Sequence, residues 1–109
     1  MKKFKNKVYT IDVQVKEWFD KVYGNSYFGG IITVNYGRKN QTQFSLPFQY
    51  GYGEHFRDEA FRLLQDNKVL NDVNERESYF RYYERKNIIA RHTKHENQLK
   101  RDVLNYSEL

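Results

Sequence analysis

The first regular pattern in the chain is an alternation of apolar and polar residues. In VYTIDVQV, residues 8–15, every second side chain from Tyr9 to Val15 is apolar. This period of two is the one that a strand with one buried face requires. The pattern therefore predicts a β-strand whose alternate side chains enter a core.

Two further β-rich segments follow, at residues 31–36 and 41–48, and the short polar connector GRKN joins them. A connector of this length is typical of a β-hairpin, so we expect Arg38 and Lys39 at its tip. Pro47 cannot donate a hydrogen bond to a sheet, which places it at a strand end or on an edge strand. The glycines that follow favour an end.

From Glu54 onward the apolar period becomes helical. One stripe carries Phe56, Ala60, Leu63 and Leu64, and the opposite stripe is polar. This spacing predicts a helix that ends near QDNK.

A second helix is predicted from about Glu75 to Lys86. Asn74 and Glu77 have the spacing of a capping box, and Glu77 can pair with Arg81 at i, i+4. We expect its aromatic face to carry residues 79, 80 and 83.

The end of the chain gives a weaker signal. NIIARHT, residues 87–93, has the β-branched content of a short strand, whereas the last 15 or so residues fit a strand, a helix or a flexible tail. The whole chain, residues 1–109, is predicted to be a single α+β domain. Its small antiparallel sheet, in the order βββααβ, should pack against one or two helices.

Composition narrows the cellular context. The chain has no cysteine, which excludes disulfides, thiolate zinc sites and cysteine nucleophiles and suits a reducing cytoplasm. No run of about 18 apolar residues is present, and no apolar segment follows the early lysines as a signal peptide would require. We expect a cytosolic protein with no membrane partner.

Charge and aromatic content both favour a binding role. Lys and Arg number 19 against 14 for Asp and Glu, a net charge of +5 that attracts polyanions without requiring one. Aromatic residues make up 17% of the chain, more large rings than one small core normally buries. Some rings are therefore expected at the surface.

Positive charge gathers between residues 76 and 101, where YFRYYERK interleaves rings with guanidinium groups. Such a mixture is expected where bases stack on rings and cations follow phosphates. It is equally expected of a helix that buries Tyr79, Phe80 and Tyr83 and leaves its arginines in solvent. Tyr and Arg are also enriched at protein interfaces, so an acidic protein would fit as well.

The segment PFQYGYGEHF, residues 47–56, lies between a predicted strand and a predicted helix. Backbone N–H groups there could bind an anion, but Phe56 breaks the pattern G-x-G-x-x-G and nearby carboxylates would repel a phosphate. We favour a tight corner allowed by Gly51 and Gly53, with Tyr50 and Tyr52 available to an interface.

Candidates for catalysis and metal binding are weak. His92 and His95 have H-x-x-H spacing, but a strand would place them on opposite faces. Glu17 and Asp20 flank Trp18, where a raised carboxyl pKa would suit acid–base chemistry, yet a solvated charge or an Asx-turn is favoured. No nucleophile elbow surrounds the serines. We expect no catalytic residue, no metal and no cofactor.

Two motifs resemble known sequences. W-F-D-K-V-x-G-N-S-Y-F, at Trp18 to Phe28, and P-F-x-Y-G-Y-G, at Pro47 to Gly53, are similar to those of a group of small uncharacterised bacteriophage and prophage proteins. The group carries no function that could be transferred. The resemblance implies a phage-type accessory protein directed at host defence.

These observations give a leading hypothesis: a non-enzymatic accessory protein that binds a host protein or nucleoprotein complex, as an anti-CRISPR-like inhibitor would. The alternatives are a small module that binds DNA or RNA directly, and a nucleotide-binding or hydrolytic protein with a pocket between the Trp18 segment and the 50–52 corner. An exposed edge near Pro47 would allow a dimer. The expected binding residues are Arg76, Arg81, Tyr82, Arg85, Lys86, Arg91, Arg38, Lys39, Trp18, Tyr50 and Tyr52.

Overall fold

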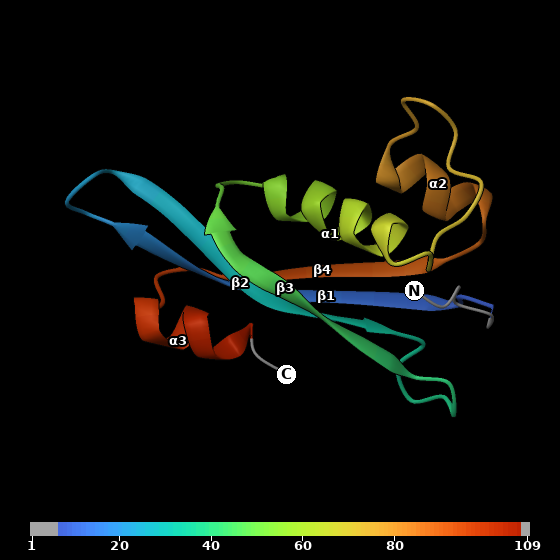
Figure 1. Ribbon diagram of the computed structural model, residues 1–109, viewed down its shortest axis with the longest axis horizontal. Helices are drawn as coiled ribbons and strands as arrows, with labels where there is room; N and C mark the ends of the chain where they lie inside the picture. Colours follow the sequence, from blue (N-terminus) through green and yellow to red (C-terminus); the bar gives the residue numbers. More distant parts are fainter. Residues whose placement is uncertain (1–6, 108–109) are drawn as a thin grey trace.

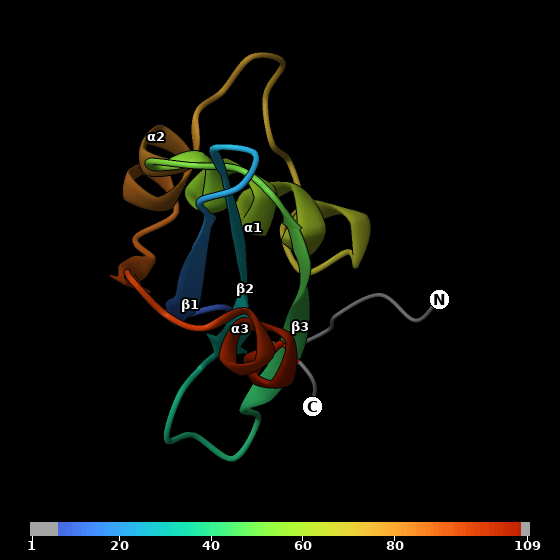
Figure 2. The ribbon, with the colours of Figure 1, turned by 90° about the vertical axis from the view of Figure 1, so that its left-hand side faces the viewer.

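The computed structural model describes residues 7–107 and contains one sheet with helices on both of its faces (Figure 1). The elements are, in chain order, β1 (Thr10–Asp20), β2 (Asn25–Val34), β3 (Thr42–Tyr50), α1 (His55–Asp66), α2 (Tyr79–Arg85), β4 (Ile89–His95) and α3 (Lys100–Tyr106). Helices α1 and α2 lie on one side of the sheet and α3 lies on the other (Figure 2).

The α+β class is confirmed, as is the order βββααβ for the first six elements. The expectation of an antiparallel sheet needs correction. The sheet has the strand order β3-β2-β1-β4 and is mixed, because β1 pairs antiparallel with β2 and parallel with β4. The chain between β1 and β4 is long enough to return beside β1 in the same direction, as a parallel pair requires. A third helix, α3, follows β4.

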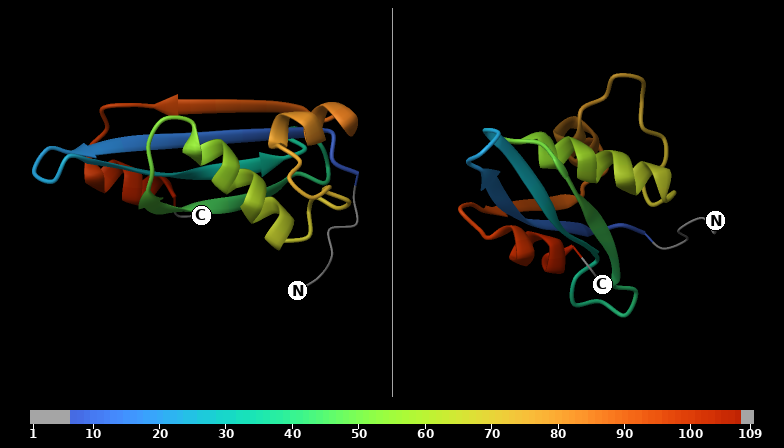
Figure 3. Two further views of the ribbon diagram at one scale, coloured as in Figure 1. Left: turned by 90° about the horizontal axis from the view of Figure 1, so that it is seen from above. Right: turned by 60° about the vertical axis from the view of Figure 1, so that its left-hand side comes forward.

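Strands β1 and β2 are longer than predicted and form one hairpin that extends beyond the helices (Figure 3). The aromatic segment after residue 15 is therefore strand and turn rather than a loop. Gly24 has a left-handed φ of 72°, and the Asp20 carboxylate accepts a hydrogen bond from the Val22 N–H at 2.9 Å. Asp20 thus forms the Asx-turn that the sequence favoured over an acid–base role.

Strand β3 continues through Pro47 to Tyr50, so the expectation that it ends at Pro47 is wrong. Because β3 is the edge strand of the sheet, the missing N–H of Pro47 leaves no neighbouring strand unsatisfied. The register with β2 shifts between Phe28 and Gly30. In the turn that connects β2 and β3, Arg38 and Lys39 are exposed at the tip of the hairpin, as predicted.

Asn35 ends β2 and fixes the start of β1. It is fully buried and has a left-handed φ of 59°, a conformation that Asn tolerates better than most residues. Its side-chain oxygen accepts from the N–H groups of Tyr9 at 2.7 Å and Thr10 at 3.3 Å, and its amide donates to the Lys7 carbonyl at 2.8 Å. One side chain therefore replaces several missing backbone partners.

The core lies between the sheet and α1. Ile11, Val13 and Val15 of β1 are fully buried, as the alternation predicted, and α1 covers them with its own apolar stripe. The stripe consists of Phe56, Ala60, Phe61 and Leu64. The first predicted helix is thus confirmed.

Helix α2 begins at Tyr79, four residues later than predicted, because Arg76 adopts a left-handed φ of 63° that a helix cannot contain. The Asn74 N–H does donate to Glu77 at 3.0 Å, but this contact closes a turn before the helix. Glu77 pairs with Arg85 rather than Arg81.

Helix α3 packs on the second face of the sheet, and its Val103 is fully buried. Gly29 makes this possible, since a Cβ there would lie 3.1 Å from the Ser107 Cβ and 3.3 Å from the Val103 carbonyl oxygen. The Ser45 hydroxyl also donates to the Ser107 carbonyl. For the last 15 or so residues the sequence was compatible with a strand, a helix or a flexible tail, and the structure has a helix that packs on the sheet. Residues 108 and 109 lie outside the described residues.

No helix among residues 7–107 is long and apolar enough to cross a membrane. The early lysines that bear on export lie partly outside the described residues.

We expect Asn35→Ala to destabilise the fold strongly. The change removes three partly buried hydrogen bonds to backbone groups and leaves Ala at a positive φ, which together should cost about 3 kcal/mol. Urea unfolding measures the loss. Asn97→Ala is the matched control, because Asn97 is exposed and has a φ of 58°. An equal effect of both changes would mean that the backbone conformation, not the hydrogen bonds, carries the stabilisation.

His92 should make stability depend on pH. Its ring lies among Phe56, Tyr79 and Tyr83, and burial, aided by Arg57 and opposed by Glu54, lowers its pKa to about 4. The unfolded chain, with an ordinary histidine pKa near 6.5, then binds more protons between these values. The part of the folding stability that depends on a neutral His92 is therefore complete above about pH 6.5 and is lost as the pH falls towards 4.

The expected loss at low pH is about 2 kcal/mol after allowing for partial exposure of the ring. Thermal unfolding between pH 7.5 and 4.5 measures it, with His92→Phe as the comparison, since carboxylates titrate alike in both proteins. Parallel pH curves for the two proteins would contradict the assignment.

Candidate functional site

The predicted basic aromatic surface does not form one continuous face. Arg76 lies in the loop before α2, Arg81 is exposed on α2, and Lys86 follows its end, 3.7 Å from an Asp72 carboxylate oxygen. Arg91 belongs to β4 and pairs with Asp12. The cations that are close in sequence therefore point in several directions.

Arg85 is held within the protein. Its guanidinium donates to both carboxylate oxygens of Glu77, at 2.8 and 2.9 Å, and to the Asp72 carbonyl at 2.7 Å. Hydrogen bonding to Arg85, together with the Asn74 N–H, lowers the pKa of Glu77 to about 2, and the same pair raises the pKa of Arg85. Arg85 thus holds the loop before α2 in place, and these contacts leave its guanidinium less available to bind a phosphate.

The rings of α2 mostly belong to the core. Tyr82 is only 3% exposed and its hydroxyl donates to the Asn71 carbonyl at 2.6 Å, while burial raises the pKa of Tyr83. Phe80, which one of the two interpretations placed on the buried face, is 59% exposed. The core interpretation of this helix is thus right for Tyr83 and wrong for Phe80, and Tyr82 is not available at the surface.

Arg91 and His92 diverge because neighbouring residues of a strand point to opposite faces. His92 faces the core, while Arg91 and His95 face the other side, so the expected separation of His92 from His95 is confirmed. Within residues 7–107 no group of three or more His, Cys, Asp or Glu side chains could hold a metal ion.

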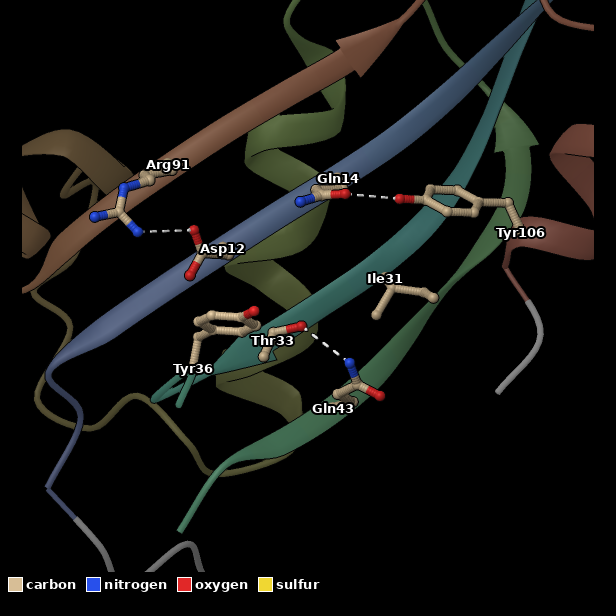
Figure 4. A pocket seen from close by; sticks show the side chains of 8 residues that line it. All are labelled: Asp12, Gln14, Ile31, Thr33, Tyr36, Gln43, Arg91 and Tyr106. Atoms are coloured by element: carbon tan, nitrogen blue, oxygen red, sulfur yellow. Dashed lines mark hydrogen bonds and ion pairs between the residues drawn. The ribbon is translucent and has the colours of Figure 1, made fainter. Parts of the chain in front are cut away.

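Arg91 lies instead at a pocket on the second face of the sheet, which we call the sheet pocket (Figure 4). It has a volume of about 360 Å³ and takes residues from all four strands, α3 and the β2–β3 connector. Its lining residues are Asp12, Gln14, Ile31, Thr33, Tyr36, Gln43, Arg91 and Tyr106.

Three polar contacts organise the sheet pocket (Figure 4). Arg91 lies 3.3 Å from Asp12 Oδ1, the Tyr106 hydroxyl donates to Gln14 Oε1 at 2.9 Å, and Gln43 Nε2 donates to the Thr33 hydroxyl at 3.2 Å. Asp12 Oδ2 is buried without a hydrogen-bond partner among the described atoms. Sequence reasoning missed this pocket, since its polar residues look like the ordinary outer face of a sheet.

A second feature lies at the projecting end of the β1–β2 hairpin and at the corner after β3, which both belong to the same end of the sheet (Figure 3). Five large apolar or aromatic side chains are exposed there, and we call them the aromatic end: Phe19, Val22, Tyr23, Tyr50 and Tyr52. Val22 is 82% exposed, Tyr23 78% and Tyr52 69%. Several large apolar side chains exposed at one end of a molecule are candidates for an interaction surface.

The two resemblance motifs meet at this end. Tyr27 pairs with both Trp18 and Tyr50 in the sheet register, and its ring stacks on Trp18 at 5.5 Å and on Phe48 at 5.3 Å between centroids. The Lys100 ammonium lies 5.3 Å from the Trp18 ring centre. Trp18 is therefore largely engaged within the protein, whereas Tyr50 and Tyr52 remain exposed.

The corner after β3 is both tight and recessed. A Cβ on Gly51 would lie 2.5 Å from the Phe28 ring and 2.8 Å from His55, so only glycine fits. An open pocket of about 530 Å³ lies beside it, lined by Tyr50, Gly51, Tyr52, Glu54, His55 and Asp58. Trp18 does not line this pocket. The carboxylates of Glu54 and Asp58, which do line it, disfavour the binding of an anion.

The remaining candidates serve the fold. Arg38 is exposed but lies 3.9 Å above the centre of the Tyr9 ring, and Lys39 is the second exposed cation of the hairpin tip. Glu17 lies 3.3 Å from the Lys94 ammonium, which also donates to the Gly53 carbonyl at 2.9 Å. This largely buried ion pair ties β1 and β4 to the corner, so Glu17 acts as a structural partner rather than beside Trp18 as an acid.

A scan against protein-family models finds no match for this chain, and comparisons with curated proteins and with solved structures find none either.

The position of Tyr82 gives a direct prediction. Tyr82→Ala should destabilise the protein by about 3 to 5 kcal/mol, because it empties a core site beside Phe61. Tyr82→Phe, which loses only the hydrogen bond to Asn71, should cost about 1 kcal/mol. Chemical unfolding measures both. A Tyr82→Ala protein as stable as the parent would mean that this ring lies at the surface.

Proposed function

We propose that the protein is a non-enzymatic, phage-type accessory protein that binds a host protein or nucleoprotein complex through its aromatic end. The observation that carries this proposal is the exposure of Phe19, Val22, Tyr23, Tyr50 and Tyr52 at one end of the molecule. Large rings and apolar side chains are costly to leave in water, and a partner that covers them gains free energy from their burial.

The shape of this end also supports a protein partner. Tyrosines on rigid backbone lose little conformational entropy on binding, and Tyr is enriched at the centres of protein interfaces. The β1–β2 turn is held by the Asp20 carboxylate, and the corner is held by Gly51 and by Lys94. The exposed side chains are therefore presented by ordered backbone beside a recess that a partner's side chain can enter.

The resemblance to phage proteins supports the same end of the molecule. Its two motifs, residues 18–28 and 47–53, are the segments that build the hairpin and the corner. An inhibitor of a host defence complex, acting in the bacterial cytoplasm in the manner of an anti-CRISPR protein, would fit this origin. The net charge of +5 would speed its encounter with an acidic surface.

Direct binding of nucleic acid through α2 has less support. Tyr82 is buried and Arg85 is bonded to Glu77, so the expected alternation of free rings and free cations is lost there. Carboxylates that could have served catalysis are engaged as well, Asp20 in a turn and Glu17 in an ion pair. A binding role without chemistry is therefore the simplest proposal.

We expect Val22→Ser combined with Tyr23→Ser to abolish capture of the partner while leaving the fold intact. Both side chains are in solvent, so the melting temperature should change little. Quantitative pull-down from a bacterial lysate, with cross-linking from position 52 to identify the contacted chain, measures the effect. Phe80→Ser is the matched control, because Phe80 is also a large apolar side chain that is mostly exposed, and it lies on α2, on a separate part of the surface.

Two results would contradict the proposal. One is a captured protein that the Val22→Ser/Tyr23→Ser double variant retains as well as the Phe80→Ser control does, which would place the interface elsewhere. The other is equal loss with Phe80→Ser, which would indicate non-specific adhesion through exposed rings.

A further inference from the structure

Strand β4 borders the sheet, and no strand lies beside it on the side away from β1 (Figure 3). The Ile89 N–H donates to the Tyr9 carbonyl at 3.0 Å, so the odd-numbered residues of β4 bond to β1. Successive peptide groups of a strand point to opposite sides, which turns the N–H and C=O groups of Ala90, His92 and Lys94 outward. No described residue forms a hydrogen bond with these outward groups.

The other edge of the sheet, β3, is less suited to pairing. It carries Pro47, which has no N–H to donate, and its register with β2 shifts between Leu46 and Gln49. Prolines and bulges are features by which proteins keep edge strands from pairing. Strand β4 contains no proline and pairs with β1 in one unbroken register from Ile89 to His95. β4 is therefore the edge that can accept a further strand.

A recess of about 300 Å³ lies beside β4 on the core face of the sheet. Its lining includes Ala90 and His92 of β4 and the rings of Tyr79 and Tyr83 of α2. Burial lowers the pKa of His92 to about 4, so its ring is neutral at pH 7. On a strand paired with β4, the side chains opposite Ala90 and His92 would lie on this same face. The recess therefore fits an apolar side chain of such a strand.

Arg91 gives the opposite face of this edge a positive charge. Its side chain is 65% exposed, and one of its nitrogens lies 3.3 Å from Asp12 Oδ1, on the side of β1. A guanidinium group has several N–H donors, so Arg91 can also donate to a carboxylate on its other side. A strand paired with β4 would place a Cβ about 5 Å from that of Arg91. An acidic residue at this position would complete the ion pair.

This edge is separate from the aromatic end. His92 pairs with Val13 in the sheet, and Phe19 lies six residues further along β1, which is about 20 Å along a strand. A ligand beside the first residues of β4 would therefore bind independently of a protein at the aromatic end.

We propose that β4 binds an extended acidic peptide segment of another protein as a fifth strand. Its main chain would bond to the outward groups of β4, an apolar side chain would enter the recess, and neighbouring carboxylates would face Arg91. Strand addition of this kind combines affinity from the main chain with specificity from alternate side chains. Each of the three features thus sets one property of the peptide.

A second copy of this chain fits the edge less well. In an antiparallel pair of β4 strands centred on His92, the register that uses all the outward groups, the two Arg91 side chains would lie on one face at diagonal positions. Like charges at such positions oppose pairing, whereas an acidic peptide is attracted.

The test is hydrogen exchange, followed by NMR, of the full chain with the peptide Ac-TVELEVT-NH2. In an extended conformation its Leu and Val side chains share one face and its Glu side chains the other. In the free protein the amides of His92 and Lys94 should exchange fast, whereas those of Arg91 and Thr93, which bond to β1, should be protected. Saturating peptide should slow the exchange of the outward amides by about tenfold or more.

Two further peptides test the side-chain requirements on the unchanged protein. Ac-TVESEVT-NH2 lacks the apolar side chain for the recess, and Ac-TVKLKVT-NH2 has the opposite charge. Each should bind at least about threefold more weakly than Ac-TVELEVT-NH2.

Arg91→Glu should reverse the preference between the acidic and the basic peptide, because the changed residue would attract lysine. Lys68→Glu is the matched control, since it alters the net charge equally at an exposed position outside β4 and should keep the preference for the acidic peptide.

The inference is overturned if Ac-TVELEVT-NH2 shows no saturable binding up to about 5 mM. Binding that leaves the outward amides unprotected would also overturn it, because contact in the recess alone requires no strand pairing. So would equal binding of the acidic and basic peptides, or a dimer in sedimentation whose outward amides are already protected. The aromatic end is tested separately, because Val22 and Tyr23 take no part in these measurements.

Discussion

The alternation of side chains along β1 is the constraint on which the rest of the structure depends. β1 pairs with β2 on one side and β4 on the other, and its odd-numbered residues Ile11 to Val15 are fully buried against α1. The even-numbered residues between them face the other side and line the sheet pocket. A slip of one residue would exchange the two sets. The core and the candidate binding face are thus fixed by the same pairing, and Asn35, which bonds to the start of β1, helps to hold it.

The second face of the sheet is organised by one close approach. The absence of a side chain at Gly29 lets α3 lie against the sheet, where Val103 is buried. Once docked, α3 separates the polar half of this face from the stacked rings of Trp18, Tyr27 and Phe48. A small helix therefore divides one sheet surface into two chemically different regions.

The sequence predicted the strands and helices that have one apolar and one polar face, because their side chains repeat with a regular period. The strand at Ile11 to Val15 and the helix beginning near Glu54 were found because one face of each is apolar. The second half of β1 was missed because Trp18 and Phe19 are consecutive rings on opposite faces, which hides the period of two. The parallel pairing of β4 and the docking of α3 depend on contacts far apart in sequence, and no local pattern announces them.

The candidate site shows why composition alone does not tell which rings and cations are free at the surface. Arginines and tyrosines are neighbours in YFRYYERK, but the helix buries Tyr82 and Tyr83, and Arg85 is bonded to Glu77. Several other cations lie over rings or beside carboxylates of the same chain, including Arg38 over Tyr9 and Lys100 over Trp18.

Charge that is already paired in the fold contributes less to recognition than the same charge in solvent would, because binding must first break the internal contact. The side chains of the aromatic end are mostly in water, so covering them breaks fewer contacts and removes apolar surface from solvent. Under the proposal of a protein partner, affinity depends mainly on the aromatic end, while the net positive charge acts at longer range on the rate of encounter.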